Sequence, residues 1–313
     1  MWINHLKKNL LSIVCPCYNE EKNLEYFSKE LFDTLQELDL EYEVIFVNDG
    51  SNDATLEKLK ELKSIYSHIK IISLSRNFGK EAALSAGIDK AKGDVLVPID
   101  ADMQHPPHVI KDLYEEWQKG YDVVLAKRKA RTTESFLKKV NAYGFYKLHN
   151  MISNIKIPQN VGDFRLISRK VVEAVKKLPE NQRFMKGVFA WVGFKTSIVE
   201  YEVNSRAYGK SSFSGWKLWN FALEGICSFS TVPLRIWLYI GVVLSFSSFL
   251  YMNYIIIQTL VFGVDAPGYA SLMSVVLFLG GIQLIGIGVL GEYIGRIYME
   301  SKKRPIYIID EEL

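Results

Sequence analysis

Up to about residue 128, the chain alternates between short apolar runs and longer segments in which apolar residues follow a helical spacing. The helical segments include residues 20–38 and 53–66. Strands that alternate with helices of this length predict right-handed βαβ units and a mainly parallel sheet with helices on both faces. The pattern therefore predicts an α/β domain. Five apolar runs are its expected strands: residues 10–18, 42–49, 69–75, 93–100 and 121–128.

Two later stretches, residues 236–264 and 266–291, contain no Asp, Glu, Lys or Arg. Each is longer than the roughly 20 residues that a helix needs to cross a bilayer. They predict two transmembrane helices, at about 236–262 and 270–296. The segments before the first and after the second are rich in Lys and Arg, so the positive-inside rule places both on the cytoplasmic side. The pair is then a hairpin, and the α/β domain and both termini face the cytosol. No signal peptide is expected at the N-terminus.

The pattern divides the chain into three parts. Residues 1–212 form the cytosolic domain, 213–231 a juxtamembrane amphipathic helix, and 232–313 the two spans with a short cytosolic tail. The net charge of +3 is too small to suggest a nucleic-acid partner. The three cysteines have neither a zinc spacing nor that of a disulfide framework, which agrees with a reducing compartment.

Polar clusters follow four of the predicted strands, at Cys17–Glu21, Asn48–Thr55, Ser75–Glu81 and Asp100–Gln104. Ligands of parallel sheets bind beyond the carboxyl ends of the strands, so these clusters are expected to converge. Asp100 and Asp102 repel each other and gain from a nearby cation. Mg²⁺ typically takes one or two carboxylates plus phosphate oxygens of a substrate. The pair therefore predicts a site for a metal that carries a diphosphate.

Three other kinds of site fit the sequence less well. A dinucleotide-binding domain would show G-x-G-x-x-G after the first strand, and a P-loop enzyme would show G-x-x-x-x-G-K-[ST]; neither motif is present. His105 and His108 lie near the aspartates and suggest a zinc site, but their place around Pro106-Pro107 is more simply explained as a helix start.

Several segments resemble family 2 glycosyltransferases with the GT-A fold (nucleotide-diphospho-sugar transferases, Rossmann-like). They are "IVCPCYNEEKNL", "FVNDGSNDAT", "LSRNFGKEAALSAGIDKAKGD", "IDADMQHPP" and "VGDFRLISR". The resemblance continues through "FMKGVFAWVGF", "NFALEGICSFSTVPLRIW" and "LGGIQLIGIGVLGEYIGRIYME". Within this family, the segments resemble enzymes that move a sugar from a nucleotide diphosphate onto a polyprenyl phosphate. They are most similar to the bactoprenol (undecaprenyl-phosphate) glucosyltransferases of O-antigen modification.

The resemblance implies roles for particular residues. Asp100 and Asp102 would hold Mg²⁺ or Mn²⁺, and Asp163 in "GDFR" matches the carboxylate usually given a catalytic or acceptor-positioning role. Arg128 and the "RAYGKS" segment, with Arg206, Lys210 and Ser211, would bind the phosphates of donor or acceptor. The residues expected to bind the nucleotide sugar are Pro16, Tyr18, Glu20, Asp49, Lys80, Asp100, Ala101, Asp102 and Gln104.

The expected reaction is an attack by a lipid phosphate oxygen on the anomeric carbon, with UDP as the leaving group and one inversion. A phosphate monoester loses its second proton near pH 6, about where phosphorylated side chains do, so much of it is already dianionic at neutral pH. Asp163 is therefore interpreted as an orienting group rather than an obligatory general base. The main demand is electrostatic, because two phosphate-bearing substrates must be brought together.

The segment from about 128 to 160 mixes aromatic and basic residues. It fits an amphipathic helix at the membrane interface, where the acceptor phosphate would be reached, and equally a helix packed on the sheet. In the second span, Gly281, Gly288 and Gly295 follow one another at steps of seven. These glycines favour close packing, either within the hairpin or between subunits of a homo-oligomer.

The expected enzyme is a multi-pass protein of the bacterial inner membrane whose partners are a UDP-sugar, undecaprenyl phosphate and the bilayer. Glucose is the favoured donor sugar, with GDP-mannose, UDP-N-acetylglucosamine and a UDP-aminopentose as alternative donors. A processive polysaccharide synthase would have more spans and a Q-x-x-R-W segment, which is missing here. A non-catalytic, membrane-anchored scaffold that binds nucleotide sugars is the alternative from another class.

Overall fold

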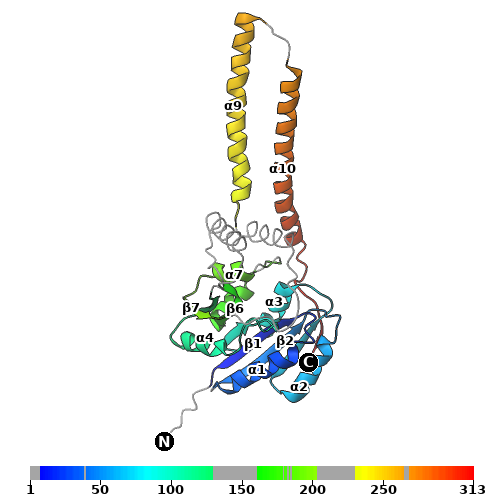
Figure 1. The fold of residues 1–313 in the computed structure, drawn as a ribbon, viewed down its shortest axis with the longest axis vertical. Coiled ribbons are helices and arrows are strands. Elements are labelled where there is room, and N and C mark those ends of the chain that lie inside the picture. Colours follow the sequence, from blue (N-terminus) through cyan, green and yellow to red (C-terminus); the bar gives the residue numbers. More distant parts are fainter. Residues whose placement is uncertain are drawn as a thin grey trace.

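A computed structural model describes residues 8–38, 40–129, 161–178, 180–181, 183, 185–202, 230–263 and 268–313. Its centre is one mixed sheet (Figure 1). The strand order of the sheet is β7-β5-β6-β4-β1-β2-β3-β8. Neighbours among β1 to β4 pair in parallel, whereas β6 and β8 run antiparallel to the strands beside them. The strands are β1 (Leu10–Cys17), β2 (Glu41–Asn48), β3 (Ile69–Leu74), β4 (Val95–Pro98), β5 (Val123–Arg128), β6 (Val161–Ser168), β7 (Thr196–Tyr201) and β8 (Ile309–Glu312).

All five expected strands are confirmed, but the sheet is more mixed than predicted. The sequence pattern did not predict β6, β7 or β8. Of these, β6 inserts between β4 and β5 and carries Asp163 into the middle of the sheet. Four of the seven strand pairings are parallel, so the expectation of a mainly parallel sheet holds, but the pairings of β6 and β8 are antiparallel.

Helices cover both faces of the sheet. On one face lie α1 (Leu24–Gln36), α2 (Thr55–Ile65) and α4 (Val109–Gln118), whose apolar residues share one buried cluster. The opposite face is covered by α3 (Lys80–Lys90), α6 (Arg169–Lys176) and α7 (Met185–Trp191). Periodic burial explains this arrangement, since Leu24, Phe27 and Leu31 form one stripe of α1 and are completely buried.

Helix α3 lies unusually close to the sheet. A Cβ atom on Gly87 would come within 2.2 Å of Val14 Cγ1 in β1. Together with Ala83 and Ala86, which are fully buried, this glycine lets the helix backbone approach β1 and β2. The close fit fixes the position of the first residue of α3, Lys80, at the carboxyl edge of the sheet.

Two long helices, α9 (Val232–Phe262) and α10 (Tyr269–Ser301), extend side by side away from the sheet (Figure 1). Both are long and apolar enough to cross a membrane, and none of the residues in their most apolar windows is buried. The predicted spans lie within these helices. Tyr293 of α10 donates a hydrogen bond to the carbonyl of Ser230, 2.7 Å away, just before α9.

The glycine spacing of α10 does not serve packing within the hairpin. Among the described residues, none comes within 4 Å of a Cβ built on Gly281, Gly288 or Gly295. Gly286 is the glycine that faces α9, because its Cβ would lie 3.2 Å from Trp237. The first of the two interpretations of the Gly281–Gly295 pattern is therefore wrong. The second, packing between subunits, stays a prediction.

The C-terminal tail is a strand rather than a simple extension. After α10 the chain returns to the sheet and β8 pairs with the edge strand β3. Ile71 and Leu313 exchange two backbone hydrogen bonds of 2.9 Å, and Ser75 N–H donates to the carbonyl of Ile308 at 3.0 Å. Tyr307 donates to Asp89 at the end of α3. The tail thus covers an exposed sheet edge and ties α10 to the α/β domain.

Deleting residues 308–313 should lower the free energy of unfolding by at least about 2–4 kcal/mol, since at least three backbone hydrogen bonds at roughly 0.5–1.5 kcal/mol each are lost. Thermal unfolding of the full-length and shortened proteins in detergent measures this. Glu312→Gln is the matched control, because it removes only an exposed ion pair with Lys90. Equal stability of the shortened and full-length proteins would show that β8 contributes nothing.

Candidate active site

Three loops at the carboxyl edge of the sheet are held together by side-chain to backbone hydrogen bonds. The loop after β1 contacts the loop after β2, because Asn19 N–H donates to Ser51 Oγ at 3.1 Å and Asn52 N–H donates to Asn19 Oδ1 at 2.9 Å. Gly50 has a φ of +61°, and a Cβ there would lie 2.3 Å from the Arg76 carbonyl carbon. The loops after β1, β2 and β3 therefore form one continuous wall.

Asp49 is on this wall, where it was predicted, but its contacts are internal. Its carboxylate accepts hydrogen bonds from the backbone N–H groups of Phe78 (2.7 Å) and Gly79 (2.9 Å), and the residue is 3% exposed. Burial raises the pKa of Asp49, and these two hydrogen bonds oppose the rise. Asp49 thus holds the loop before α3, a role that the sequence analysis did not predict.

The other residues expected to bind the nucleotide lie on the same wall. Pro16 is near the end of β1, and Tyr18 directly after the strand is 44% exposed. Glu20 is partly buried and accepts a hydrogen bond of 2.6 Å from Asn23 Nδ2. Of these three, Tyr18 presents the largest open surface to a ligand.

Asp100 and Asp102 follow β4 directly, as predicted. Between them Ala101 is 1% exposed, so the loop is anchored in the core while the aspartates stay partly exposed. Asp102 Oδ1 accepts a hydrogen bond from Gln104 N–H at 3.1 Å. Met103 adopts a left-handed conformation with a φ of 62°, which is uncommon outside glycine and typical of functional loops.

Lys80 joins the two predicted acidic positions. Its ammonium nitrogen lies 2.8 Å from Asp100 Oδ2 and 2.8 Å from Asp163 Oδ2. The three residues come from the start of α3, the loop after β4 and strand β6. The structure therefore brings together residues that are up to 83 positions apart in the sequence.

Asp163 lies in a group of buried charges around this bridge. Burial would raise the pKa of Asp163, but Lys80 and Lys186 outweigh it and hold the pKa well below its ordinary value. The pKa of Glu81 is raised to about 8, first by burial and then by the Asp163 charge. Burial lowers the pKa of Lys186, and it lowers that of Arg165 to about 10. The sequence analysis placed Glu81 in a polar cluster at this edge but gave no role to Glu81, Arg165 or Lys186.

His105 connects the Asp100 side to Arg128. Its Nε2 lies 3.9 Å from Asp100 Oδ2 and 3.3 Å from an Arg128 guanidinium nitrogen, and its Nδ1 lies 2.7 Å from the Tyr201 hydroxyl. Burial lowers the pKa of His105 to about 4, so the ring is neutral at pH 7. The helix start expected around Pro106-Pro107 is confirmed, because α4 begins at Val109 with His108 at its N-cap position. His105 precedes this start, and its ring contacts Arg128 and Tyr201.

Two buried polar atoms of this site have no hydrogen-bond partner among the described residues, Arg128 Nε and Asp163 Oδ1. Buried polar groups are normally paired, so each is a place where a ligand group is expected. Arg128 offers a donor and Asp163 an acceptor. Arg206, Lys210 and Ser211, the segment 130–160 and the juxtamembrane helix apart from its last residues lie outside the described residues.

Asp100 and Asp102 fit a metal ion whose coordination is completed by phosphate oxygens of a substrate. The described part of the chain has no group of three or more His, Cys, Asp or Glu side chains that could hold an ion alone. Mg²⁺ shared with a substrate needs only one or two carboxylates. Asp100 and Asp102 supply two from one loop, and Lys80 neutralises Asp100.

The mixed α/β sheet with carboxylates at its carboxyl edge, followed by an apolar helical hairpin, agrees with the GT-A class of glycosyltransferases, which the family matches show. The chain belongs to glycosyltransferase family 2. The model of "Glycosyl transferase family 2" matches residues 12–176, and that of "GtrB C-terminal hairpin" matches residues 232–297.

Relatives match over nearly the whole chain. A "Bactoprenol glucosyl transferase" of Shigella phage SfV is 55% identical over 96% of this chain and 98% of its own length. A "Prophage bactoprenol glucosyl transferase homolog" of Escherichia coli (strain K12) is 54% identical with the same coverage. A solved structure of glucosyl-3-phosphoglycerate synthase from Mycobacterium tuberculosis is 18% identical over 70% of this chain and 78% of that chain, with a TM-score of 0.45, a weak similarity.

Glu81→Gln should change how stability depends on pH. Because the folded-state pKa of Glu81 is raised from 4.5 to about 8, the folded protein holds a proton that the unfolded chain releases. The wild-type protein should therefore lose stability as pH rises from about 4.5 to 8, on the order of 5 kcal/mol from this group. Denaturant unfolding across this range should show a smaller loss for Glu81→Gln. Glu115→Gln is the control, because Glu115 is exposed on α4. If the free energy of unfolding fell equally steeply with pH in the wild type and both variants, Glu81 would not be the group with the raised pKa.

Proposed function

We propose that the protein transfers glucose from UDP-glucose to undecaprenyl phosphate at the cytoplasmic face of the bacterial inner membrane, with inversion and with Mg²⁺ or Mn²⁺. The observation that carries this proposal is the acidic edge of the sheet, where Lys80 is held between Asp100 and Asp163 and Asp102 lies in the same loop. The names of the relatives support the acceptor and the sugar. The apolar hairpin supports a lipid acceptor, because a long prenyl chain stays in the bilayer.

In this proposal the donor diphosphate lies against the loop after β4. Asp100 and Asp102 would hold the metal, which would supply positive charge beside the departing diphosphate. Lys80 is already bound to Asp100, so it is placed to contribute a second positive charge at the same loop. The wall formed by the first three loops, with exposed Tyr18, receives the nucleoside.

The acceptor phosphate lies near Arg128 in the proposed complex. Its guanidinium group contacts His105 and has one buried nitrogen, Nε, without a hydrogen-bond partner in the described part of the chain, which suits an anionic oxygen. His105 is neutral at pH 7, so it orients Arg128 without competing as a cation. Arg206, Lys210 and Ser211 are proposed as further phosphate ligands on the basis of the family resemblance.

Asp163 is proposed to orient the donor sugar rather than to remove a proton. Its pKa lies well below the ordinary value, because Lys80 and Lys186 outweigh its burial, and a carboxylate with such a pKa is a weak base. The acceptor phosphate needs little deprotonation at neutral pH. The Oδ1 atom of Asp163, which no described residue hydrogen-bonds, suits a sugar hydroxyl, since a phosphate oxygen would be repelled by the carboxylate charge.

Asp102→Asn should abolish transfer, with a loss of at least about 10³-fold in kcat, because the diphosphate loses a metal ligand. Asp163→Asn should retain more activity, since an amide still orients a hydroxyl. Transfer of radiolabel from UDP-glucose into an organic-extractable lipid, measured from pH 6 to pH 9, compares the two. Near-normal turnover by Asp102→Asn would reject the metal role of Asp102. If Asp163→Asn lost more activity than Asp102→Asn across the pH series, general-base catalysis by Asp163 would be favoured.

A panel of donors tests the choice of sugar. With undecaprenyl phosphate in detergent, UDP-glucose should give a kcat/KM at least about tenfold above those of GDP-mannose, UDP-N-acetylglucosamine and a UDP-aminopentose. Addition and removal of Mg²⁺ and Mn²⁺ in the same assay test the metal. A preference for another donor would change the sugar but keep the reaction. Donor binding without transfer to any lipid would support the scaffold alternative.

A further inference from the structure

Tyr201, the last residue of β7, makes a hydrogen bond inside the candidate active site. Its hydroxyl oxygen lies 2.7 Å from His105 Nδ1, and on the other side of the imidazole ring His105 Nε2 lies 3.3 Å from Arg128 Nη2. Tyr201 is 5% exposed and His105 is 2% exposed. The three side chains therefore form one largely buried chain of hydrogen bonds, which runs from β7 through the loop after β4 to the end of β5.

The chemistry of arginine fixes the direction of both hydrogen bonds. A guanidinium group carries only N–H donors and no acceptor, so Arg128 donates and His105 Nε2 offers a lone pair. A positively charged ring would instead bring a second donor against Arg128, which is unfavourable at this distance. In a neutral imidazole the other nitrogen carries the proton. His105 Nδ1–H therefore donates to the Tyr201 oxygen, an assignment that follows from the donors and acceptors around the ring.

The position of the proton on His105 decides which neighbour the ring serves. With the proton on Nε2, the ring would direct an N–H group toward Asp100 Oδ2, which lies 3.9 Å away, and would also turn it against the donor of Arg128. Arg128 would then lose its acceptor. The Tyr201 oxygen favours the opposite tautomer, because it is an acceptor for Nδ1–H and a buried N–H group without an acceptor is costly.

The ring of Tyr201 is held by packing that does not involve its hydroxyl group. Its centroid lies 5.7 Å from that of Phe164, with the two rings edge to face, and 5.9 Å from that of His105. The rings of His105 and Phe164 are 5.0 Å apart. Aromatic contacts of this kind stabilise a core beyond the area they bury. A phenylalanine at position 201 keeps all three contacts, so the role of the hydroxyl can be separated from that of the ring.

We propose that Tyr201 is a positioning residue: its hydroxyl group fixes the tautomer of His105 and, through His105, the orientation of Arg128 toward the acceptor phosphate. Tyr201 itself touches no reacting group. His105 holds Arg128 Nη2, and the buried Arg128 Nε, which has no hydrogen-bond partner in the described part of the chain, is then presented in one direction. The step to the phosphate rests on the proposed function, whereas the tautomer of His105 does not.

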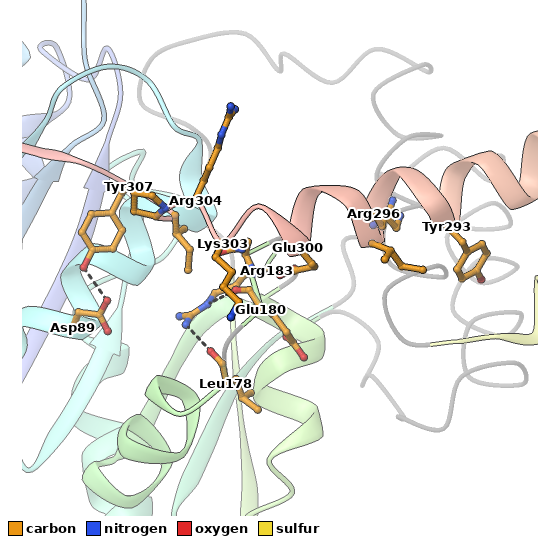
Figure 2. A pocket seen from close by; sticks show the side chains of 14 residues that line it. Asp89, Leu178, Glu180, Arg183, Tyr293, Arg296, Glu300, Lys303, Arg304 and Tyr307 are labelled. Carbon is orange, nitrogen blue, oxygen red and sulfur yellow. Dashed lines mark hydrogen bonds between the residues drawn. The ribbon is translucent and has the colours of Figure 1, made fainter.

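The tautomer is measured by NMR on the full-length protein in detergent at pH 7, with nitrogen-15 in its histidines and no substrate present. The signal that disappears in His105→Asn is assigned to His105. The wild-type ring should carry its proton on Nδ1, and Tyr201→Phe should move it to Nε2. Tyr307→Phe is the control for this measurement. Figure 2 shows that the Tyr307 hydroxyl also makes a hydrogen bond, of 2.8 Å to Asp89, but in the cavity at the base of α10, so the His105 tautomer should stay unchanged.

Kinetics test the step from His105 to the acceptor. Tyr201→Phe should raise the KM for undecaprenyl phosphate about tenfold, as expected for one weakened charge-assisted hydrogen bond. The KM for UDP-glucose and kcat should change less than about twofold, whereas a general structural defect would change all three. Tyr114→Phe is the matched control, because the half-buried hydroxyl of Tyr114 on α4 accepts a hydrogen bond of 3.2 Å from Asn9; both KM values should stay within about twofold. In an Arg128→Gln background, Tyr201→Phe should add less than about twofold, because it acts through Arg128.

A proton on Nε2 of His105 in the wild-type protein would overturn the proposal, as would the same tautomer in the wild type and Tyr201→Phe. Equal rises of the two KM values in Tyr201→Phe would also overturn it, and so would a full tenfold effect of this substitution in the Arg128→Gln background. Failure of the wild-type protein to transfer sugar to undecaprenyl phosphate would contradict the proposed function instead. The tautomer measurement needs no substrate, so it would still decide whether Tyr201 fixes His105.

Discussion

The candidate site depends on one ammonium group between two carboxylates. Asp163 is 15% exposed in its side chain, and a carboxylate that is this far removed from water is strongly disfavoured unless a cation accompanies it. Lys80 supplies that cation and binds Asp100 with the same nitrogen. The position of Lys80 depends in turn on the close packing of α3, which Gly87 permits. The packing of α3 on the sheet therefore determines where the positive charge of the site lies.

Much of the fold could be predicted from the sequence, because the first five strands and the two apolar helices are local patterns. Strands β6, β7 and β8 could not. The side chains of β7 alternate between exposed and half-buried up to the buried Tyr201 at its end, and β8 is four residues long and mostly charged, so neither shows a continuous apolar run. Their positions are set by pairing with β5 and β3, which are distant in the sequence. Long-range pairing of this kind leaves no periodic signal in the segment itself.

The same distinction separates the predicted from the unpredicted parts of the site. Asp100 and Asp102 could be predicted because both lie in one loop directly after an apolar run, where sheet geometry places ligands. The contact between His105 and Tyr201 joins residues 96 positions apart, and the two residues give no joint signal. Asp49 shows the opposite case. Its place was predicted correctly, but a carboxylate in a turn can serve a ligand or the protein's own N–H groups, and only the structure shows that it serves Phe78 and Gly79.

Helix α3 is the physical link between the acidic site and the apolar hairpin. Its first residue binds both site carboxylates, and its last turn accepts the Tyr307 hydroxyl from the chain that leaves α10. Between these ends, small buried residues keep the helix rigidly against β1 and β2. A displacement of α10 relative to the domain would therefore act on the end of α3, and the close packing leaves little room to absorb it. For an enzyme whose acceptor phosphate can be reached only at the membrane surface, a misplacement of about 1 Å can cost two orders of magnitude in rate. Rigid attachment through α3 and β8 is then a requirement of the proposed chemistry and not merely of folding.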